Sequence, residues 1–344
     1  MKRFSHYLLF AFTILFSACS SDLEVIGNYK ETIVVYGLLD QSQPKQYIKI
    51  NKAFLGEGNA LGYAQIKDSS QFVNSLNVVL KRIKDGTELS SITLSPDNTI
   101  PKQPGTFYGP DQQNAVYSCA TPPGTLNTDS DYKLVIKNNE TGVEVSSQTP
   151  LISDAVLTSP PSGSPFLSFI NPNSNNYQYQ VRWTTGKNAR IYQLIIQLNY
   201  IDSTDSGNIT QVLDWVFPEQ KTLGLSGNES IKNDFLGQSI MQFIGNQLND
   251  YSGLIARRVL NAKLILVAGG DDLNTFIEVN KPSTSIVQEK PEFTNITNGL
   301  GILSSRYTKP PFSRPLAAAT WDSLSCGQFT KDLKFLNHLG LPCQ

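Results

Sequence analysis

Histidine is the residue type whose scarcity most limits the chemistry of this chain, with 2 copies in 344 residues. His6 lies in a segment that we expect to be removed, which leaves His338 near the C-terminus. A zinc site with two or three imidazole ligands is therefore excluded from the mature chain. A Ser-His-Asp triad would have to use His338, but no Gly-x-Ser-x-Gly elbow occurs in the sequence. We expect His338 to be a surface residue of the tail.

Charged residues are also sparse, at 17% of the chain, and the 28 basic and 29 acidic residues nearly cancel. A nucleic-acid-binding protein needs a basic face, so nucleic acid is excluded as a partner. No Gly-x-x-x-x-Gly-Lys-Ser/Thr phosphate loop is present, and Gly299 and Gly301 lack the third glycine of a dinucleotide fingerprint. The sequence predicts no cofactor and no metal centre.

The N-terminus carries the most informative pattern of the sequence. It begins with Met1-Lys2-Arg3, continues with a mostly apolar run over residues 7–16, and reaches Ser17-Ala18-Cys19. A charged start, an apolar region of about 7–15 residues and a small-residue cleavage site define a secretory signal. The apolar run is shorter than the roughly 20 residues that a membrane-spanning helix needs. We therefore predict an exported protein rather than a transmembrane anchor.

Cys19 directly after small residues is typical of bacterial lipoproteins, although Phe16 stands where leucine is usual. We predict a signal peptide over residues 1–18, a diacylglycerol on the Cys19 thiol, and a polar tether over residues 19–30. The protein is then held at the outer membrane by its acyl chains. No polybasic segment adds electrostatic attraction to anionic lipid, so the acyl chains alone must provide the anchoring.

The other three cysteines have different predicted roles. Cys326 and Cys343 lie close together in the sequence, in a compartment that permits disulfides. A bridge between them would close a loop of about 18 residues and contribute roughly 3 kcal/mol on the loop-entropy model. Two free thiols are the alternative. Cys119 lies in an apolar alternation, which favours an inert buried thiol over a nucleophile.

β-branched and aromatic runs separated by turn residues predict a mainly β protein. Residues 31–150 contain six or seven short strands, which favours an immunoglobulin-like β-sandwich. The segment 55–72 is expected to be a loop with little regular structure. Strands are predicted at the following positions: 32–39, 47–53, 76–83, 115–120, 132–137 and 143–147.

A second β-rich domain is predicted over residues 151–344, with one or two helices. It starts with a stretch rich in Pro, Ser and Asn over residues 159–176, which we interpret as a linker or loops. The 3.6-residue spacing of apolar side chains predicts a helix near 232–249. Asp271 and Asp272 are expected to cap a short helix ending near Phe276. Strands are predicted at the following positions: 177–183, 191–198, 212–217, 259–267 and 301–305.

Carboxylates and tryptophans are the remaining candidates for chemistry or binding. Asp129–Asp131 and Asp202–Asn208 are oxygen-rich clusters, but neither has the spacing of an EF-hand, so we interpret both as solvated turns. A glycosidase needs only two carboxylates, which keeps a carboxylate-dependent hydrolase as a minor alternative. Trp183 and Trp215 are expected in the core, and Trp321 is the more exposed candidate for stacking on a sugar.

Several of these segments also resemble a known family. They are Ile33–Leu39, Tyr47–Ile50, Tyr132–Leu134 before Gln148–Pro150, and above all Phe293–Ile302 running into Ser304–Arg306. Together they resemble the Bacteroidota lipoproteins grouped as domain of unknown function 4249, over nearly the whole mature chain. The resemblance implies an envelope lipoprotein often encoded beside a TonB-dependent outer-membrane receptor, and it implies no catalytic residues. An acidic stretch after the acylated cysteine favours export to the cell surface in that phylum. Residues 20–24 match it only in part, so the cell surface and the periplasmic face both stay open.

The sequence thus predicts a non-enzymatic outer-membrane lipoprotein, an accessory binding protein associated with a TonB-dependent receptor. The alternative is a carbohydrate- or peptide-binding module whose loops hold the ligand. The predicted site residues are Cys19 for lipid and Cys326 with Cys343 for a disulfide, with no catalytic residue assigned.

Overall fold

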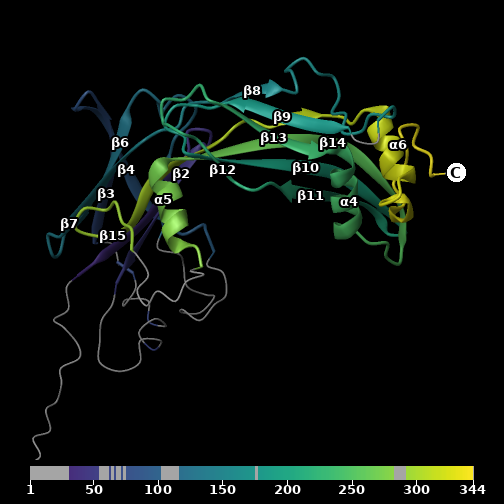
Figure 1. Cartoon of the computed structure of the whole chain (residues 1–344). Coiled ribbons are helices and arrows are strands. Elements are labelled where there is room, and N and C mark those ends of the chain that lie inside the picture. Colours follow the sequence, from purple (N-terminus) through teal and green to yellow (C-terminus); the bar gives the residue numbers. More distant parts are fainter. Residues whose placement is uncertain are drawn as a thin grey trace, which may run out of the picture.

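The chain is mainly β, as predicted, and its computed structural model describes residues 31–53, 62, 66, 71–72, 75–101, 116–174, 177–282 and 292–343. The predicted signal peptide, Cys19 and the tether lie outside the described residues, as does most of the predicted 55–72 loop. Figure 1 shows two β-rich bodies side by side, with the C-terminus at the far end of the second. We call them the first and the second sandwich.

The first sandwich is a curled sheet whose two halves face each other across an apolar core. Its strand order is β1-β2-β5-β4-β3-β6-β7. β4 joins the two halves, because its earlier part, through Leu94, pairs with β3 and its last three residues, Ser95 to Asp97, pair with β5. The strands are β1 (Ile33–Leu39), β2 (Lys45–Lys52), β3 (Leu76–Lys84), β4 (Thr87–Asp97), β5 (Val116–Ala120), β6 (Asp131–Asn138) and β7 (Glu144–Pro150).

Period-two alternation explains these strands, because every second side chain points into the core. In β2 the side chains of Gln46, Ile48 and Ile50 are buried, while Tyr47 and Lys49 between them are exposed. β4 was not predicted, because most of its side chains are exposed and its sequence shows little alternation.

β15 (Leu300–Thr308) connects the two sandwiches. Its first part runs parallel to β1, from Leu300 opposite Val34 to Ser305 opposite Leu39. Its last residues, beginning at Arg306, pair antiparallel with β14 of the second sandwich. Leu303 is fully buried in the first core. A strand far along the sequence therefore completes the sandwich formed by residues 31–150.

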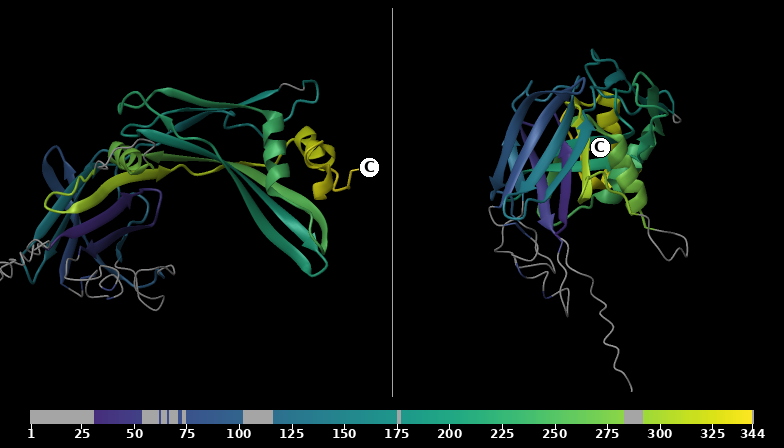
Figure 2. Two further views of the ribbon diagram at one scale, coloured as in Figure 1. Left: turned by 60° about the horizontal axis from the view of Figure 1, so that its bottom comes forward. Right: turned by 90° about the vertical axis from the view of Figure 1, so that its left-hand side faces the viewer.

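The second sandwich has two separate layers around a larger core, which Figure 2 shows diverging toward the C-terminal end. One layer is the three-stranded sheet β13-β9-β8, and the other is built on the long strands β10, β11 and β14. The strands are β8 (Val156–Ser159), β9 (Gln178–Thr184), β10 (Ile191–Thr204), β11 (Gly207–Val216), β12 (Gln220–Lys221), β13 (Ser230–Leu236), β14 (Leu254–Gly269) and β16 (Phe312–Arg314).

Helices lie at both ends of the second sandwich (Figure 1). α5 (Asp271–Asn280) follows β14 and contacts β15, near the first sandwich. α4 (Gly237–Gln247) and α6 (Ala318–Cys326) lie at the opposite end, where the two layers diverge, followed by the short 3-10 helix η1 (Lys331–Leu333).

Two helix predictions need correction. The helix predicted near 232–249 begins only at Gly237, because residues up to Leu236 form β13 and pair with β9. Phe235 satisfies both the helical spacing and the strand alternation, and buried Asn233 hides the alternation in the sequence. The second helix extends to Asn280, and its N-cap is Gly270, with no side-chain cap from the aspartates.

Candidate functional site: a pocket beside the C-terminal disulfide

A cavity of about 270 Å³ lies between α4, α6 and the segment that leads into β9. Its wall combines apolar and neutral polar side chains, and none of the lining residues is charged. The lining residues are Ile170, Asn171, Pro172, Ser174, Tyr177, Gly237, Gln238, Met241, Ser323, Gly327, Gln328 and Phe329.

One face of α4 carries the pocket. Gly237, Met241 and Gly245 are four residues apart and therefore lie above one another on the helix. A Cβ at Gly237 would lie 1.8 Å from the Phe169 carbonyl oxygen, and a Cβ at Gly245 would lie 2.4 Å from that of Phe329. A helical glycine costs about 1 kcal/mol relative to alanine. Here both glycines let a chain segment approach the helix backbone, and the buried Met241 lies between them.

Neutral amides lie around this apolar surface. The side chains of Gln238 and Gln328 are exposed, and within the described ranges neither has a hydrogen-bond partner. Asn171 accepts a hydrogen bond from the Asn173 backbone N–H at 3.0 Å, so its own amide NH₂ stays a donor. Phe329 is 40% exposed. The pocket thus offers donors, acceptors and an aromatic ring without any formal charge.

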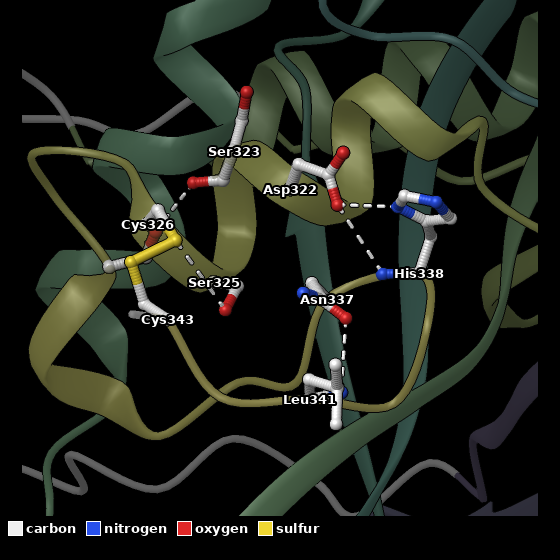
Figure 3. The surroundings of a disulfide bond; sticks show 9 residues. Asp322, Ser323, Ser325, Cys326, Asn337, His338, Leu341 and Cys343 are labelled. Carbon is white, nitrogen blue, oxygen red and sulfur yellow. Dashed lines mark hydrogen bonds and ion pairs between the residues drawn. A yellow bond between two sulfur atoms is a disulfide. The ribbon is translucent and has the colours of Figure 1, made fainter.

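A disulfide lies directly beside the pocket wall. Cys326 is bonded to Cys343 across a sequence separation of 17 residues, with 5.2 Å between the Cα atoms. Cys326 ends α6, and the next three residues, Gly327 to Phe329, line the pocket. Figure 3 shows the tail folding back over α6 to make this bond. The bridge therefore joins the end of the chain to the segment that forms one side of the pocket.

His338 belongs to the same tail and is exposed, as predicted. Its ring Nδ1 lies 2.7 Å from the Asp322 carboxylate, and its backbone N–H donates to the same oxygen at 3.4 Å (Figure 3). Asn337 accepts the N–H groups of Leu339 and Leu341. These bonds hold the tail against α6.

Asp202 is the carboxylate that the sequence interpretation misplaced. It is not a solvated turn residue, because the hairpin turn follows it and its side chain points into the second sandwich. Asp202 and Arg257 are each 3% exposed in their side chains, with Oδ1 accepting from Nε at 3.0 Å. Tyr251 donates to the other carboxylate oxygen at 2.9 Å. Asp202 is therefore part of a buried ion pair.

Asp129 is engaged by cations of the same domain. Its two oxygens accept from Arg82 at 2.9 Å and from Lys84 at 2.6 Å. The hydrogen bond from Lys84 holds the pKa of Asp129 well below its usual range. Among the described residues, no three His, Cys, Asp or Glu side chains gather closely enough to hold a metal ion.

The tryptophans pack against the second core. Trp183 is fully buried, and Trp215 is half-buried and stacks on Phe243 with 5.4 Å between the ring centroids. Trp321, the more exposed candidate for stacking on a sugar, is also partly buried and packs against this core. Cys119 is a free, buried thiol, and burial raises its pKa.

The asparagine- and glycine-rich segment after Phe293 lies where the two sandwiches meet, and it contacts β15, β1 and α5. Asn295 accepts from the Leu303 N–H at 2.9 Å and donates to the Leu303 carbonyl at 2.7 Å. It also donates to Asp272 at 2.9 Å, a carboxyl whose pKa is raised by burial. A Cβ at Gly301 would lie 1.9 Å from the Val35 carbonyl oxygen. The motif thus seats β15 against β1.

Sequence reasoning missed the pocket, since its lining comes from three segments that are far apart in the sequence. One signal was present: Gly237 and Gly245 flank Met241 within the apolar helical pattern. An isolated glycine in a predicted helix often has a packing reason. Two of them on one face indicate where other segments approach.

Comparison with known proteins adds little. No protein-family model and no curated protein matches the chain. A crystal structure of the C-terminal globular domain of an oligosaccharyltransferase from Pyrococcus abyssi is 10% identical, with 84% of this chain covered and a TM-score of 0.28. This chain spans 50% of that structure. The calcium-binding domain CBD12 of CALX1.1 is 10% identical, with 80% of this chain and 98% of that one covered and a TM-score of 0.16. TM-scores this low carry no conclusion.

Each helix within the described ranges is too short or too polar to cross a lipid bilayer.

Proposed function

We propose that the mature chain is a lipid-anchored, non-enzymatic binding protein of the outer membrane that acts as an accessory to a TonB-dependent receptor. The N-terminal pattern ending in Cys19 carries the proposal, because a charged start, a short apolar run and small residues before a cysteine are what lipoprotein export requires. The resemblance to the Bacteroidota lipoprotein family supports the receptor as partner.

The short tether adds a geometric constraint. Thirteen residues, 20–32, separate Cys19 from the start of β1. Fully extended, they span about 45 Å. The start of β1 would then stay within that distance of the bilayer. A tether of this length keeps the protein close to the membrane in which the proposed receptor lies.

Anchoring is tested by Cys19→Ala. Acyl chains contribute about 0.8 kcal/mol per buried CH₂, and stable attachment needs more than one of them. We expect the variant to lose lipid modification and either leave the membrane fraction or accumulate as precursor. Cys119→Ala is the matched control, since that thiol is buried in the first core and should not affect anchoring. A Cys19→Ala protein that is processed and stays in the outer membrane contradicts the proposal.

Partnership is tested by affinity purification of the lipidated protein from its native envelope. We expect an outer-membrane receptor to co-purify in stoichiometric amount. A stable complex buries about 1,200 Å² or more, and a chain of this size can provide that area. An isolated protein without a receptor, or one that hydrolyses a glycoside, ester, peptide or phosphate substrate through a pair of its carboxylates, contradicts the proposal.

A further inference from the structure

We propose that the pocket on α4 binds a single uncharged sugar ring. The inference rests on the proposed function only for the cellular location at which the sugar is bound. The class of ligand is inferred from the residues that line the pocket. It gives the binding protein a ligand class.

Charge decides against anionic ligands. Carboxylates and phosphates are recognised through charge-assisted hydrogen bonds from Arg or Lys. None of the twelve residues lining the pocket is charged. An ion of either sign would lose its hydration here without gaining an oppositely charged side chain, so the ligand is neutral.

Size and shape decide against a peptide strand or a lipid chain. Pockets for drug-sized ligands are about 300–1,000 Å³, and this one, at about 270 Å³, is slightly smaller. It is a compact cavity on one helix face rather than a groove along a sheet edge, which is the usual site for an extended peptide. A purely apolar ligand would also bury the Gln238 and Gln328 amides without partners, which is costly. One small, hydroxyl-rich unit fits these limits.

The lining matches the two surfaces of a pyranose. The ring presents C–H groups to an apolar wall, and Met241, Ile170 and Phe329 are apolar residues of the pocket lining. Its hydroxyls both donate and accept hydrogen bonds. Carboxamides also do both, with an acceptor oxygen and two N–H donors each. The unpartnered amides of Gln238 and Gln328, together with the Asn171 NH₂, are therefore suited to hydroxyls at several positions around one ring.

The test is saturation-transfer NMR on the purified full-length mature protein with D-glucose, D-galactose, D-mannose and N-acetyl-D-glucosamine, each at about 10 mM, a concentration that detects Kd values in the millimolar range. We expect transfer to at least one of them and none to D-glucuronate at the same concentration. Gln238→Ala and Gln328→Ala should each weaken binding about fivefold, the loss of one neutral hydrogen bond.

Gln242→Ala is the matched control, because Gln242 is an exposed glutamine of the same helix that does not line the pocket. All three glutamines are exposed, so circular dichroism should show an unchanged fold. The inference is overturned if no neutral sugar gives transfer, if glucuronate binds as well as the neutral sugars, or if the Gln238→Ala/Gln328→Ala double variant binds like wild type. A protein that co-purifies with a receptor but binds no sugar overturns this inference alone. Sugar binding without a receptor overturns the proposed function alone.

Discussion

The two sandwiches are closed in different ways. The sheet of the first has its two outermost strands covered: β15 adds to β1, and the segment before β15 bridges to β7, where the backbone groups of Ser146 and Thr297 exchange hydrogen bonds of 3.3 and 2.8 Å. The second keeps two separate layers, and α4, α6 and the tail fill the end where they diverge. Backbone hydrogen bonds thus cover the sheet edges of the first sandwich, whereas side-chain packing and a disulfide close the open end of the second.

This difference explains where the pocket lies. Exposed sheet edges invite pairing with other chains, and adding a strand to an edge removes that hazard. In the second sandwich helices close the end where the layers diverge, and a cavity lies between α4 and α6. The pocket that we propose as a sugar site therefore lies where helices, and not a paired strand, close the sandwich.

The largest expected loss of stability comes from Gly301→Val, which should disrupt the pairing of β15 with β1 in the first sandwich. Gly301 has φ of +106°, and any Cβ would lie 1.9 Å from the Val35 carbonyl oxygen. Strained backbone and a clash with rigid backbone add together, so we expect a loss of about 4 kcal/mol or more in the free energy of unfolding. Urea denaturation followed by circular dichroism measures it.

Gly142→Val is the control for backbone strain alone, because Gly142 has φ of +75° in open space. It should cost about 1–2 kcal/mol. Tryptophan fluorescence adds a second readout, since Trp183, Trp215 and Trp321 all lie in the second sandwich. In Gly301→Val the circular dichroism transition should move more than the fluorescence transition. Equal losses in the two glycine variants would show that β15 does not depend on close approach to β1.

The next largest loss of stability is expected from breaking the buried ion pair of the second sandwich, Asp202 with Arg257. Arg257→Met leaves the Asp202 carboxylate buried, and it also removes donors to the Leu333 and Asn249 carbonyls. Breaking a buried pair from one side costs about 3–5 kcal/mol. Tryptophan fluorescence should report this loss directly. Lys81→Met, which removes an exposed pair with Glu88, should cost less than about 1 kcal/mol. Similar losses in both variants would mean that Asp202 is hydrated in solution.

Local patterns predicted most of the strands because their alternation is strong. The segments 47–53, 132–137 and 191–198 each overlap an observed strand. Long-range pairing is not encoded in a local pattern: nothing near residue 301 indicates that its strand pairs with β1. For the same reason Asp202 looked like a loop residue, since its partner Arg257 lies 55 residues away.

Of the candidate site, the sequence predicted only the disulfide that lies next to the pocket. Cys326 and Cys343 stood out because of their spacing, and the structure bonds them beside the pocket. The pocket itself needs three chain segments to meet, and only the spacing of Gly237 and Gly245 indicated one wall. Cys19, the residue on which the proposed function rests, is identified by sequence alone.

The disulfide gives a third, smaller effect confined to the end of the second sandwich. Cys326→Ser opens a loop of about 18 residues, worth roughly 3 kcal/mol on the loop-entropy model and less where the tail stays bound by other contacts. We expect a lower melting temperature, faster amide exchange over residues 327–343, and a free thiol at Cys343. Cys119→Ala is the control: its melting temperature, like that of wild type, should fall when a reductant is added. An oxidised wild type with three titratable thiols contradicts the bridge.

The smallest effect is a pH dependence of the first sandwich that centres on Asp97. This carboxylate is 3% exposed and accepts from Lys45 at 2.5 Å, from Ser118 at 2.9 Å and from the Thr99 hydroxyl at 2.6 Å. The Lys45 hydrogen bond first, and then those from Thr99 and Ser118, hold the pKa of Asp97 well below its model-peptide value of 3.8. A carboxyl whose pKa is lowered by folding stabilises the folded state above its unfolded pKa, and this contribution is lost as pH falls through the folded value.

We therefore expect Asp97→Asn to lower the melting temperature at pH 7 and the difference from wild type to shrink steadily below pH 3.8. Lys45→Met should shift that loss to higher pH, because it removes the largest cause of the lowered pKa. Circular dichroism melts between pH 2 and pH 7 measure both, and a wild-type-to-Asn difference that is constant over this range would show that Asp97 is not held by these contacts.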